Sequence, residues 1–442
     1  MEGSTPLSVR LCQQLLKLKR VLKPLRVYSD QIEMLEFPYP GSRMMVCRKS
    51  LREEKPNEAL RSITLRYLIR KTDNPYSQNI KSFEDRIEED GVINDVEIAK
   101  YRKLLNDARQ HELKKHDVVL CTCAAAQDPN FNKTMNFRQI LIDECSMATE
   151  PEALIPLVSH NPEQIVLLGD HKQMQPIVQC KLARTLGMKK SLFERYQTTS
   201  CKDLVTMLDT QYRMHEDICK FPSETFYNGS LRTGGKRETS VLLCPSKEPT
   251  AILFGHVEGQ EETLVVSTKE GNENSTTNVE EVEQAVRIAS LLISKSGIDP
   301  TSIAILTPYN AQVSKINETL SKKDIKDVAV CTVMKSQGSE WRYVILSTVR
   351  SCAQSEIDRQ VPRPTKAWLS KKLGFITDPN QVNVAITRAQ DGLCILGNQH
   401  LLKCSALWEK LLAHYHDKKC VVDPAKSIQV KPRGNSNSKR RK

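Results

Sequence analysis

Short apolar runs that alternate with helix-like segments are the feature that most constrains the fold of this chain. Each run is rich in Val, Ile and Leu, and most are followed closely by Gly, Asp, Thr or Pro, as is typical of strands buried in parallel sheets. The runs are Val118–Cys121, Gln139–Ile142, Ile165–Leu168, Ile303–Leu306, Tyr343–Ser347 and Leu393–Leu396. Helix-like segments lie between them, over Thr149–Ser159, Asn278–Ser294 and Asn310–Lys322. Strands that alternate with helices predict an α/β protein with parallel sheets.

The apolar runs form two groups. The first group ends near residues 201–210 and the second begins near Ala251, with a Gly-, Thr- and Lys-rich stretch over residues 228–239 between them. This spacing predicts two α/β domains. A heavily charged region before the first of these runs, residues 50–115, contains two helix-like segments, Ile80–Glu89 and Asp95–Lys115. We therefore expect a helical insertion in the first domain.

The charge balance permits a polyanionic partner without requiring one. The 442 residues include 65 Lys and Arg against 53 Asp and Glu, which gives a net charge of +12. Six of the positive charges lie in Lys431–Lys442, a segment without acids, so the remainder carries +6. Such a segment is typical of a solvated disordered end, and equally of a nuclear-import signal or a nucleic-acid contact.

Cysteine spacing and hydropathy bear on the compartment. The 14 cysteines are scattered without a CxxC pair, which indicates thiols of a reducing compartment and neither a disulfide framework nor a zinc site. No run of 18 or more apolar residues occurs, so we expect no transmembrane helix and no membrane partner. We expect the chain to be cytoplasmic, nuclear or both.

Acidic residues end two neighbouring apolar runs. The run Gln139–Ile142 is followed by Asp143 and Glu144, and the run Ile165–Leu168 leads to Asp170. Carboxylates at the carboxyl ends of parallel strands can hold Mg²⁺ through water and polarise an attacking water beside a phosphate. Taken alone, an Asp-Glu pair after a strand more often belongs to the acidic first turn of a helix. The second strand-end acid favours the nucleotide site.

Two arginines lie in separate short motifs. Gln173 follows Asp170 in Gly-Asp-His-Lys-Gln-Met-Gln-Pro, where it could sense a γ-phosphate. Arg213 lies in Gln-Tyr-Arg-Met-His and Arg388 in Asn-Val-Ala-Ile-Thr-Arg-Ala, with Ser-Gln-Gly-Ser-Glu at residues 336–340 between them. Planar guanidinium groups suit the charge on a transferring phosphoryl group. A single arginine is more often a surface residue, so this hypothesis depends on the motifs occurring together.

In this order and spacing, the five motifs resemble those of superfamily 1 helicases of the up-frameshift-like group. The resemblance covers most of the chain, from Leu25 to Tyr415, and implies an α/β fold of two RecA-like lobes of the P-loop NTPase type. The implied parts are a non-matching segment (residues 1–24), a first lobe (25–210) that contains a helical insertion (50–115), a second lobe (211–415) and a basic disordered tail (416–442). Three stretches are also similar to the second helicase unit of one member of the group: Leu25–Gln31, Leu60–Leu65 and Thr122–Ala126.

Carried over motif by motif, the resemblance implies a site for ATP and Mg²⁺. Asp143 would hold Mg²⁺ through water, with Glu144 as its Walker B partner. Gln173 would sense the γ-phosphate and Arg388 would be the arginine finger. Tyr212 and Arg213 would stack near the adenine and contact phosphate. Glu340 would lie near the ribose, and Gly338 and Asp170 would lie beside the nucleotide.

The resemblance also implies a path for single-stranded nucleic acid across both lobes. Thr307, Pro308 and Tyr309 would meet the backbone in the second lobe, and Thr122, between Cys121 and Cys123, would meet it in the first. In the family, backbone contacts outnumber base contacts, so binding is expected to tolerate many sequences. The resemblance favours RNA over DNA.

A helicase also needs the loop G-x-x-x-x-G-K-[ST], whose amides and lysine cradle the phosphates. Gly235-Lys236 is the one Gly-Lys in the sequence, Arg237 follows it, and it lies after Asp143 and Glu144. We therefore expect a fragment or an incomplete gene product, inactive alone as an ATPase. Losing the P-loop strand is expected to leave Ile165–Leu168 as an uncovered apolar edge.

Three functions are compatible with these observations. The first is an ATP-dependent RNA or DNA helicase with most of its machinery in this chain. The second is a non-catalytic protein that binds nucleic acid or acts as an adaptor, a reading that the missing P-loop lysine favours. The third, a transcriptional co-regulator that binds other proteins, follows from the resemblance to one family member. No LxxLL-like motif supports this third function.

Overall fold

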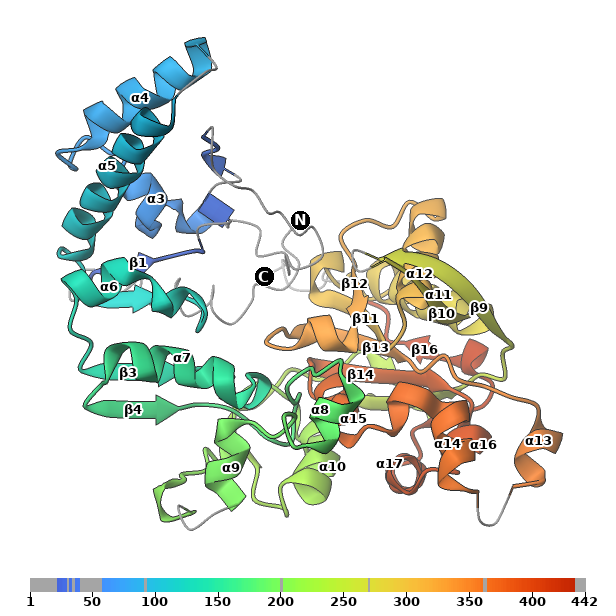
Figure 1. The fold of residues 1–442 in the computed structure, drawn as a ribbon. Coiled ribbons are helices and arrows are strands. Elements are labelled where there is room, and N and C mark those ends of the chain that lie inside the picture. The colour runs from blue at the N-terminus through green and yellow to red at the C-terminus, as the bar shows by residue number, and fades with distance from the viewer. Residues whose placement is uncertain are drawn as a thin grey trace, which may run out of the picture. The chain divides into compact units, whose positions relative to one another are not determined.

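The computed structural model describes residues 22–29, 32–33, 36–39, 58–90, 94–198, 202–268, 271–360 and 364–433 (Figure 1). These residues form two compact units. The N-terminal unit contains residues up to 171 together with 175–205, and the C-terminal unit contains 172–174 and the residues from 206 onward. Each unit is described below by itself. In the part of the chain that the structure describes, no helix is both long and apolar enough to cross a membrane.

The N-terminal unit begins with a two-stranded parallel sheet covered by helices. Strand β1 (Pro24–Arg26) pairs with β2 (Val118–Leu120), and Leu25 is fully buried among apolar side chains of the helices that connect the two strands. The connecting elements are η1 (Glu58–Ile63), α3 (Leu65–Leu68), α4 (Ser77–Asp90) and α5 (Asp95–Leu113). In Figure 1, α4 and α5 lie side by side as the longest helices of this unit.

Helix α5 forms because its sequence has a cap and one apolar face. The Asn94 side chain accepts a hydrogen bond from the Glu97 amide at 2.9 Å, which satisfies one free N–H of the first turn. Its buried positions, Ile98, Tyr101, Leu105 and Ala108, recur every three or four residues and face the core. The two helices predicted over Ile80–Glu89 and Asp95–Lys115 are therefore α4 and α5.

A second parallel pair carries the predicted acids. Strand β3 (Gln139–Ile142) pairs with β4 (Gln164–Leu167), connected by α7 (Glu150–His160). Among the described residues, β4 pairs with β3 alone. Leu141 in β3 is 61% exposed, and Ile165 and Val166 in β4 are 50% and 43% exposed, so the prediction that these two runs are buried strands is wrong. Within the described ranges, β4 is therefore an edge strand with exposed apolar side chains, as expected from the missing P-loop strand.

The remaining elements of this unit are short. After β2 come η2 (Ala125–Gln127) and α6 (Pro129–Thr134), and after β3 comes η3 (Cys145–Met147). After β4 come α8 (Lys181–Thr185), α9 (Leu192–Thr198) and η4 (Lys202–Leu204).

The C-terminal unit is built on a six-stranded sheet in which every neighbouring pair is parallel. Its order is β12-β11-β13-β14-β8-β15. The strands are β8 (Ile252–His256), β11 (Ile303–Thr307), β12 (Ala329–Thr332), β13 (Trp341–Ser347), β14 (Ala389–Gly397) and β15 (Val421–Val422). Strand β11 is buried throughout and β13 almost so, as their apolar runs predicted. This sheet confirms the α/β class.

Helices and small sheets complete this unit. Helix α11 (Val279–Ser294) packs its buried face on β13 and β14, beside α12 (Asn310–Lys322). The further helices are α10 (Glu216–Phe226), α13 (Gln354–Asp358), α14 (Lys366–Leu373), α15 (Pro379–Ile386), α16 (Gln399–Leu402) and α17 (Ala406–Asp417). The 3-10 turns are η5 (Pro300–Ser302), η6 (Val333–Ser336), η7 (Gly374–Thr377) and η8 (Ala425–Ser427). The small sheets pair β5 (Thr210–Gln211) with β6 (Arg232–Thr233), β7 (Leu242–Leu243) with β16 (Gln429–Val430), and β9 (Glu261–Thr268) with β10 (Gly271–Asn278).

Residues 416–433 correct one expectation. They were expected to belong to a disordered tail, but β15 joins the six-stranded sheet beside β8, and Ile428 and Val430 are buried in the core. The Arg287 side chain fixes the segment by donating to the carbonyl oxygens of Ala425 and Ile428 at 2.8 and 3.2 Å. Apolar residues within a basic sequence supply the burial that holds this segment. Residues 434–442 lie outside the described residues.

A carboxyl group lies buried in the first turn of α11. Glu281 is fully buried, and its Oε2 accepts hydrogen bonds from the Ser347 hydroxyl at 2.6 Å and the Val349 amide at 2.9 Å. Burial raises the pKa of Glu281 to about 8, and the hydrogen bonds only partly offset that effect. Val349 has a φ of 71°, an uncommon conformation for a β-branched residue, and its bond to Glu281 helps to hold it.

The pKa of Glu281 predicts how stability depends on pH. In the unfolded chain this group ionises near its ordinary pKa of 4.5, whereas in the folded protein it keeps its proton up to about pH 8. Its contribution is therefore complete below pH 4.5 and is lost as pH rises toward 8, by roughly 1.4 kcal/mol per pH unit. Glu281→Gln, which keeps the shape and neutral charge, is expected to remove this dependence. Urea unfolding of both proteins at pH 5, 6.5 and 8 measures it, and parallel pH profiles would contradict it.

Candidate functional site

The loop after β3 holds Asp143 and Glu144 in a defined turn. The Glu144 amide donates to Asp143 Oδ1 at 2.9 Å, and Glu144 adopts a left-handed conformation with φ 51° and ψ 34°. Asp143 is exposed and Glu144 is half-buried. Carboxylate oxygens that face solvent at the end of a strand are ligands that Mg²⁺ prefers.

The loop after β4 is joined to this turn. The Cys145 amide donates to the Leu168 carbonyl at 2.8 Å, and the Asp170 amide donates to the Ser146 hydroxyl at 3.3 Å. A Cβ at Gly169 would lie 3.0 Å from the Ser146 nitrogen, so the two loops approach closely there. The structure thus brings together Asp143, Glu144 and Asp170 at one edge of the β3–β4 pair.

Arg388 connects several segments within the C-terminal unit. It follows α15, is 2% exposed, and donates from Nε to the Val384 carbonyl at 2.9 Å and from Nη1 to the Ser339 carbonyl at 3.3 Å. Its Nη2 donates to Gln173 Oε1 at 3.1 Å and to Thr387 Oγ1 at 3.0 Å. Two residues predicted to face the γ-phosphate, Gln173 and Arg388, are therefore in direct contact.

Gln173 belongs by its contacts to the C-terminal unit. The Asn383 side-chain amide donates to the Lys172 carbonyl at 2.9 Å, and the Asn380 side-chain amide donates to the Gln173 carbonyl. Both asparagines lie on α15, which also leads to Arg388. A motif that follows β4 in sequence is therefore held by the same helix that positions the predicted arginine finger.

Arg213 forms an ion pair with Glu340. Its Nε lies 2.6 Å from Glu340 Oε2, and its Nη1 donates to the Thr387 carbonyl at 3.1 Å. The second oxygen of Glu340 accepts from the Gln390 side chain at 3.1 Å. Thr387 therefore contacts both predicted arginines, so Arg213, Glu340 and Arg388 form one connected cluster. The side chains of Arg213 and Glu340 are 28% and 24% exposed, which leaves them open to solvent and to ligand.

Tyr212 is the most exposed of the predicted nucleotide contacts. Its side chain is 71% exposed, beside Gly234, where a Cβ would lie 2.5 Å from the ring. The Arg237 guanidinium donates to the Tyr212 carbonyl at 2.6 Å and fixes the backbone. An exposed ring on a fixed backbone suits stacking on a purine.

Gly338 lies in a type II β-turn. The Ser339 amide donates to the Ser336 carbonyl at 3.0 Å, Gln337 has φ −60° and ψ 141°, and Gly338 has φ 75°. This third position of a type II turn requires a positive φ, which glycine adopts without strain. The turn ends at Ser339, whose carbonyl binds Arg388, and directly precedes Glu340. Gly338 therefore shapes the loop that carries two partners of the arginines.

The predicted nucleic-acid contacts differ in exposure. Thr122 is exposed and its hydroxyl accepts from the Ala125 amide at 3.2 Å. Thr307 is fully buried and Tyr309 is 7% exposed, so neither side chain is available to a ligand on the surface of this structure. Pro308 between them is half-buried. Burial raises the pKa of Cys121 to about 11 and raises that of Cys123, which keeps both thiols protonated.

The residues after β3 and β4 suit the magnesium part of a nucleotide site. Asp143, Glu144 and Asp170 supply oxygen ligands. The sequence contains no G-x-x-x-x-G-K-[ST] loop, so no lysine-bearing cradle for the β-phosphate is present in this chain. The predictions of ATP and Mg²⁺ binding stay predictions.

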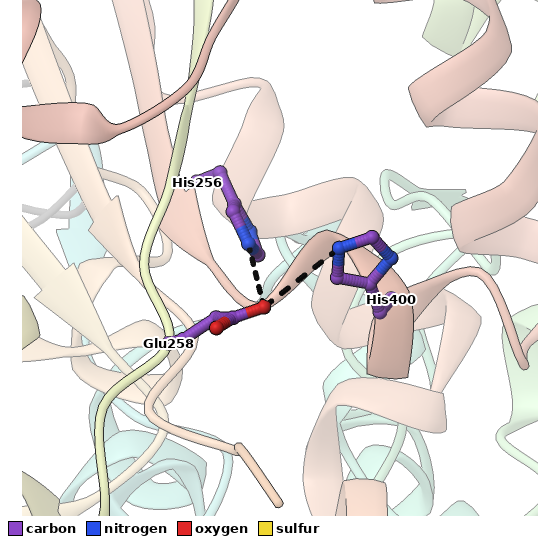
Figure 2. Close-up of side chains that lie close together, drawn as sticks. All are labelled: His256, Glu258 and His400. Atoms are coloured by element: carbon purple, nitrogen blue, oxygen red, sulfur yellow. Dashed lines mark hydrogen bonds and ion pairs between the residues drawn. The ribbon is translucent and has the colours of Figure 1, made fainter. Parts of the chain in front are cut away.

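A histidine cluster at the end of β8 lies outside this site (Figure 2). His256 Nε2 and His400 Nε2 lie 3.2 and 3.8 Å from Glu258 Oε1. His256 Nδ1 accepts a hydrogen bond from the Gln399 amide at 3.1 Å, so the ring proton lies on Nε2. If His256 bound a metal ion through Nε2, its proton would have to lie on Nδ1, where it would oppose the Gln399 N–H. The cluster is thus a hydrogen-bonded group that does not fit a metal ion.

Sequence reasoning missed the residues that hold the arginines. Thr387 and Ser339 lie within the recognised motifs and Gln390 directly follows one, but none of the three was assigned a role. Their position within or beside a motif was the available signal. Their roles arise from hydrogen bonds between segments more than 40 residues apart, which no local pattern reveals.

Two family models match this chain, one after the other along the sequence. Residues 13–181 and residues 188–400 each match a family described as an AAA domain. The first match begins before Leu25, where the resemblance was expected to begin. Together the two matches cover most of the chain.

Relatives of known sequence include two proteins with RNA-related names. The human 3'-5' exoribonuclease HELZ2 is 50% identical over 433 residues, covering 97% of this chain and 15% of that protein. It is the family member whose sequence the three stretches Leu25–Gln31, Leu60–Leu65 and Thr122–Ala126 resemble. The regulator of nonsense transcripts 1 homolog of Arabidopsis thaliana is 35% identical over 388 residues, covering 86% and 29%. The ATP-dependent helicase NAM7 of Saccharomyces cerevisiae is 35% identical over 357 residues, covering 78% and 34%. The chain thus spans about a third or less of each relative.

The type II turn predicts a specific sensitivity to substitution. Gly338→Ala places a Cβ at a φ of 75°, which is expected to destabilise the C-terminal unit by about 1–2 kcal/mol. Gly235→Ala is the matched control, because a Cβ there has open space around it. Urea unfolding measures both free energies. Equal stability of the two variants would show that the turn does not require glycine.

Proposed function

Because the chain belongs to the superfamily 1 helicases of the up-frameshift-like group, we propose that it supplies part of an ATP-dependent helicase acting on single-stranded RNA. Its units have the RecA-like fold of that family, with the first lobe incomplete. In this proposal the C-terminal unit contributes the arginines and a surface for nucleic acid. The N-terminal unit contributes the acids for Mg²⁺.

The cluster of Arg213, Thr387 and Arg388 is the observation that carries this proposal. Thr387 accepts from Arg213 through its carbonyl and from Arg388 through its hydroxyl, so the arginines of two motifs lie beside one residue. Gln173 and Glu340 each bind one of these arginines. Phosphoryl transfer is catalysed almost wholly by positioning and charge stabilisation, and two fixed guanidinium groups supply both. Arg388 would have to exchange a protein acceptor for a phosphate oxygen to act as the finger.

ATP and Mg²⁺ are the cofactors of the proposed activity. When bound, Mg²⁺ would neutralise the developing charge on the phosphates. Asp143 would hold the ion through water, and Glu144 would orient the attacking water. The chain as given lacks the P-loop, so we propose that it has no ATPase activity of its own.

RNA is the proposed polymer, in the cytoplasm, the nucleus or both. The names of two relatives, an exoribonuclease and a regulator of nonsense transcripts, concern RNA and support it over DNA. The cysteines in the described part of the chain are free thiols, as a reducing compartment favours. The basic segment Lys431–Lys442 adds positive charge for phosphates or for nuclear import.

A second candidate function is a non-catalytic protein that binds nucleic acid, or a transcriptional co-regulator that binds other proteins. The absence of the P-loop lysine from the sequence favours it for this chain. The two candidates differ in one respect. A helicase part becomes active when the P-loop segment is added, and a non-catalytic protein does not.

We expect ATP hydrolysis by the 442-residue chain to be near background, even with RNA present, because its sequence contains no P-loop motif to cradle the β-phosphate. A longer chain that includes a P-loop strand is expected to hydrolyse ATP, because that strand would supply the cradle. Glu144→Gln in the longer chain should abolish the activity, and Arg388→Ala should reduce it strongly. Phosphate release measures all four proteins. Turnover by the 442-residue chain that Glu144→Gln removes would disprove the proposal.

Binding of single-stranded RNA is expected to weaken steeply with salt, because Lys and Arg that neutralise phosphates release counterions. Removing residues 431–442 should lower the slope of log K against log salt if the tail takes part. Fluorescence anisotropy with a labelled oligouridylate between 50 and 200 mM salt measures the slope. A flat salt dependence of the intact chain would contradict nucleic-acid binding altogether.

A further inference from the structure

Phe375 is a large aromatic side chain that the fold holds on the surface. It lies in η7, between α14 and α15, and is 56% exposed, whereas the next residue, Ile376, is 5% exposed. Its ring centroid lies 5.8 Å from that of Tyr309, which is buried beneath it. None of the nucleotide or nucleic-acid contacts predicted above includes Phe375.

The turn that carries Phe375 is braced by several hydrogen bonds. The Trp408 indole donates to the Ile376 carbonyl at 2.7 Å, and the Thr377 hydroxyl donates to the Gly374 carbonyl at 2.7 Å. The Asp378 amide donates to the Phe375 carbonyl at 3.1 Å. The backbone around Phe375 is therefore fixed, so the exposed ring cannot fold inward by a simple change of the turn.

Gly374 brings this turn against Tyr309 and Arg350. It has a φ of 57°, and a Cβ there would lie 2.8 Å from the Tyr309 hydroxyl and 3.1 Å from Arg350 Nη1. Arg350 donates to the Tyr309 hydroxyl at 3.1 Å and to the Lys371 carbonyl at 2.8 Å, which ties the end of α14 to the same point. The buried Tyr309 thus supports the exposed Phe375.

Phe375 lies at the edge of the sheet where ligands bind in parallel α/β folds. It lines a small apolar hollow with Pro308, Val333 and Thr348. Pro308, Val333 and Thr348 are the residues directly after β11, β12 and β13. The hollow therefore lies at the carboxyl ends of three parallel strands. Pro308 belongs to the segment predicted to meet nucleic acid.

Lysines lie on two elements that adjoin this turn or the hollow, α14 and η6. Helix α14, which leads into Gly374, carries Lys366, Lys371 and Lys372 and no acid. Lys366 and Lys371 are exposed, and Lys335 on η6 is exposed beside Val333. An exposed aromatic ring flanked by lysines has the chemistry of a site for single-stranded nucleic acid, in which bases stack on rings and phosphates meet cations.

We propose that Phe375 is a base-stacking residue for single-stranded nucleic acid, with Lys371 and Lys335 as phosphate contacts beside it. This inference rests on the proposed function and deepens it. Tyr309 was expected to contact nucleic acid directly, but its side chain is buried. In this proposal Tyr309 instead supports Phe375, and Phe375 contacts the base. Stacking on Phe375 would depend on the presence of a base and little on its identity, since every base has a π-face.

The test uses the 442-residue chain and two labelled oligouridylates, one intact and one with abasic sites. Phe375→Leu is expected to weaken binding of the intact strand roughly 5- to 100-fold without changing the salt slope, because stacking involves no counterions. Phe375→Tyr, which keeps a ring, should restore it. On the abasic strand, Phe375→Leu should have no effect, since there is no base to stack.

Two controls separate stacking from charge and from stability. Lys371→Ala should lower the salt slope and leave the difference between intact and abasic strands unchanged. Leu264→Ala, which removes a 41%-exposed apolar side chain on β9, should change nothing. Equal binding of the intact strand by wild type and Phe375→Leu would overturn this inference and leave the proposed function standing. Absence of binding by the wild type would overturn both.

Discussion

The buried guanidinium group of Arg388 is the interaction on which the C-terminal unit depends. A cation that is 2% exposed is stable only when its N–H groups find acceptors, and here Val384, Ser339, Gln173 and Thr387 each provide one. These acceptors come from α15, from the turn at Gly338 and from the segment at Gln173. Removing Arg388 would therefore loosen three segments at once. The same contacts bring together the residues that the family motifs contain.

The two sheets that carry the motif residues differ in completeness, and this difference explains the proposed division of labour. The six parallel strands of the C-terminal unit bury their apolar runs. This sheet fixes Glu340 and Arg388 at the amino ends of β13 and β14, and the hollow beside Phe375 at the carboxyl ends of β11, β12 and β13. Strand β4 in the N-terminal unit has one partner among the described residues, and its side chains face solvent. The acids at its end are therefore held by loop contacts, such as that between Ser146 and Asp170, more than by a covered sheet.

Local patterns predicted the strands well and the long-range contacts poorly. The runs at Gln139–Ile142 and Ile303–Leu306 became β3 and β11, because apolar runs followed by turn residues have few alternatives. Strand β15, of two residues, has no such signal, and its basic surroundings suggested disorder. The motifs located Arg213, Glu340 and Arg388, but the role of Thr387 between them depends on residues distant in sequence. Burial of Thr307 and Tyr309 was likewise invisible, since a ligand-contact motif and a core segment look alike in sequence.

The central claim is that this chain binds single-stranded RNA through the C-terminal unit but has no complete ATP site. The most direct measurement is equilibrium titration of one preparation with a fluorescent ATP analogue and with a labelled oligouridylate, each in the presence of Mg²⁺. The account predicts saturable binding of the RNA and no saturable binding of the analogue. Saturable analogue binding that unlabelled ATP displaces and Arg213→Ala weakens would contradict it, because the phosphates would then be held without a P-loop.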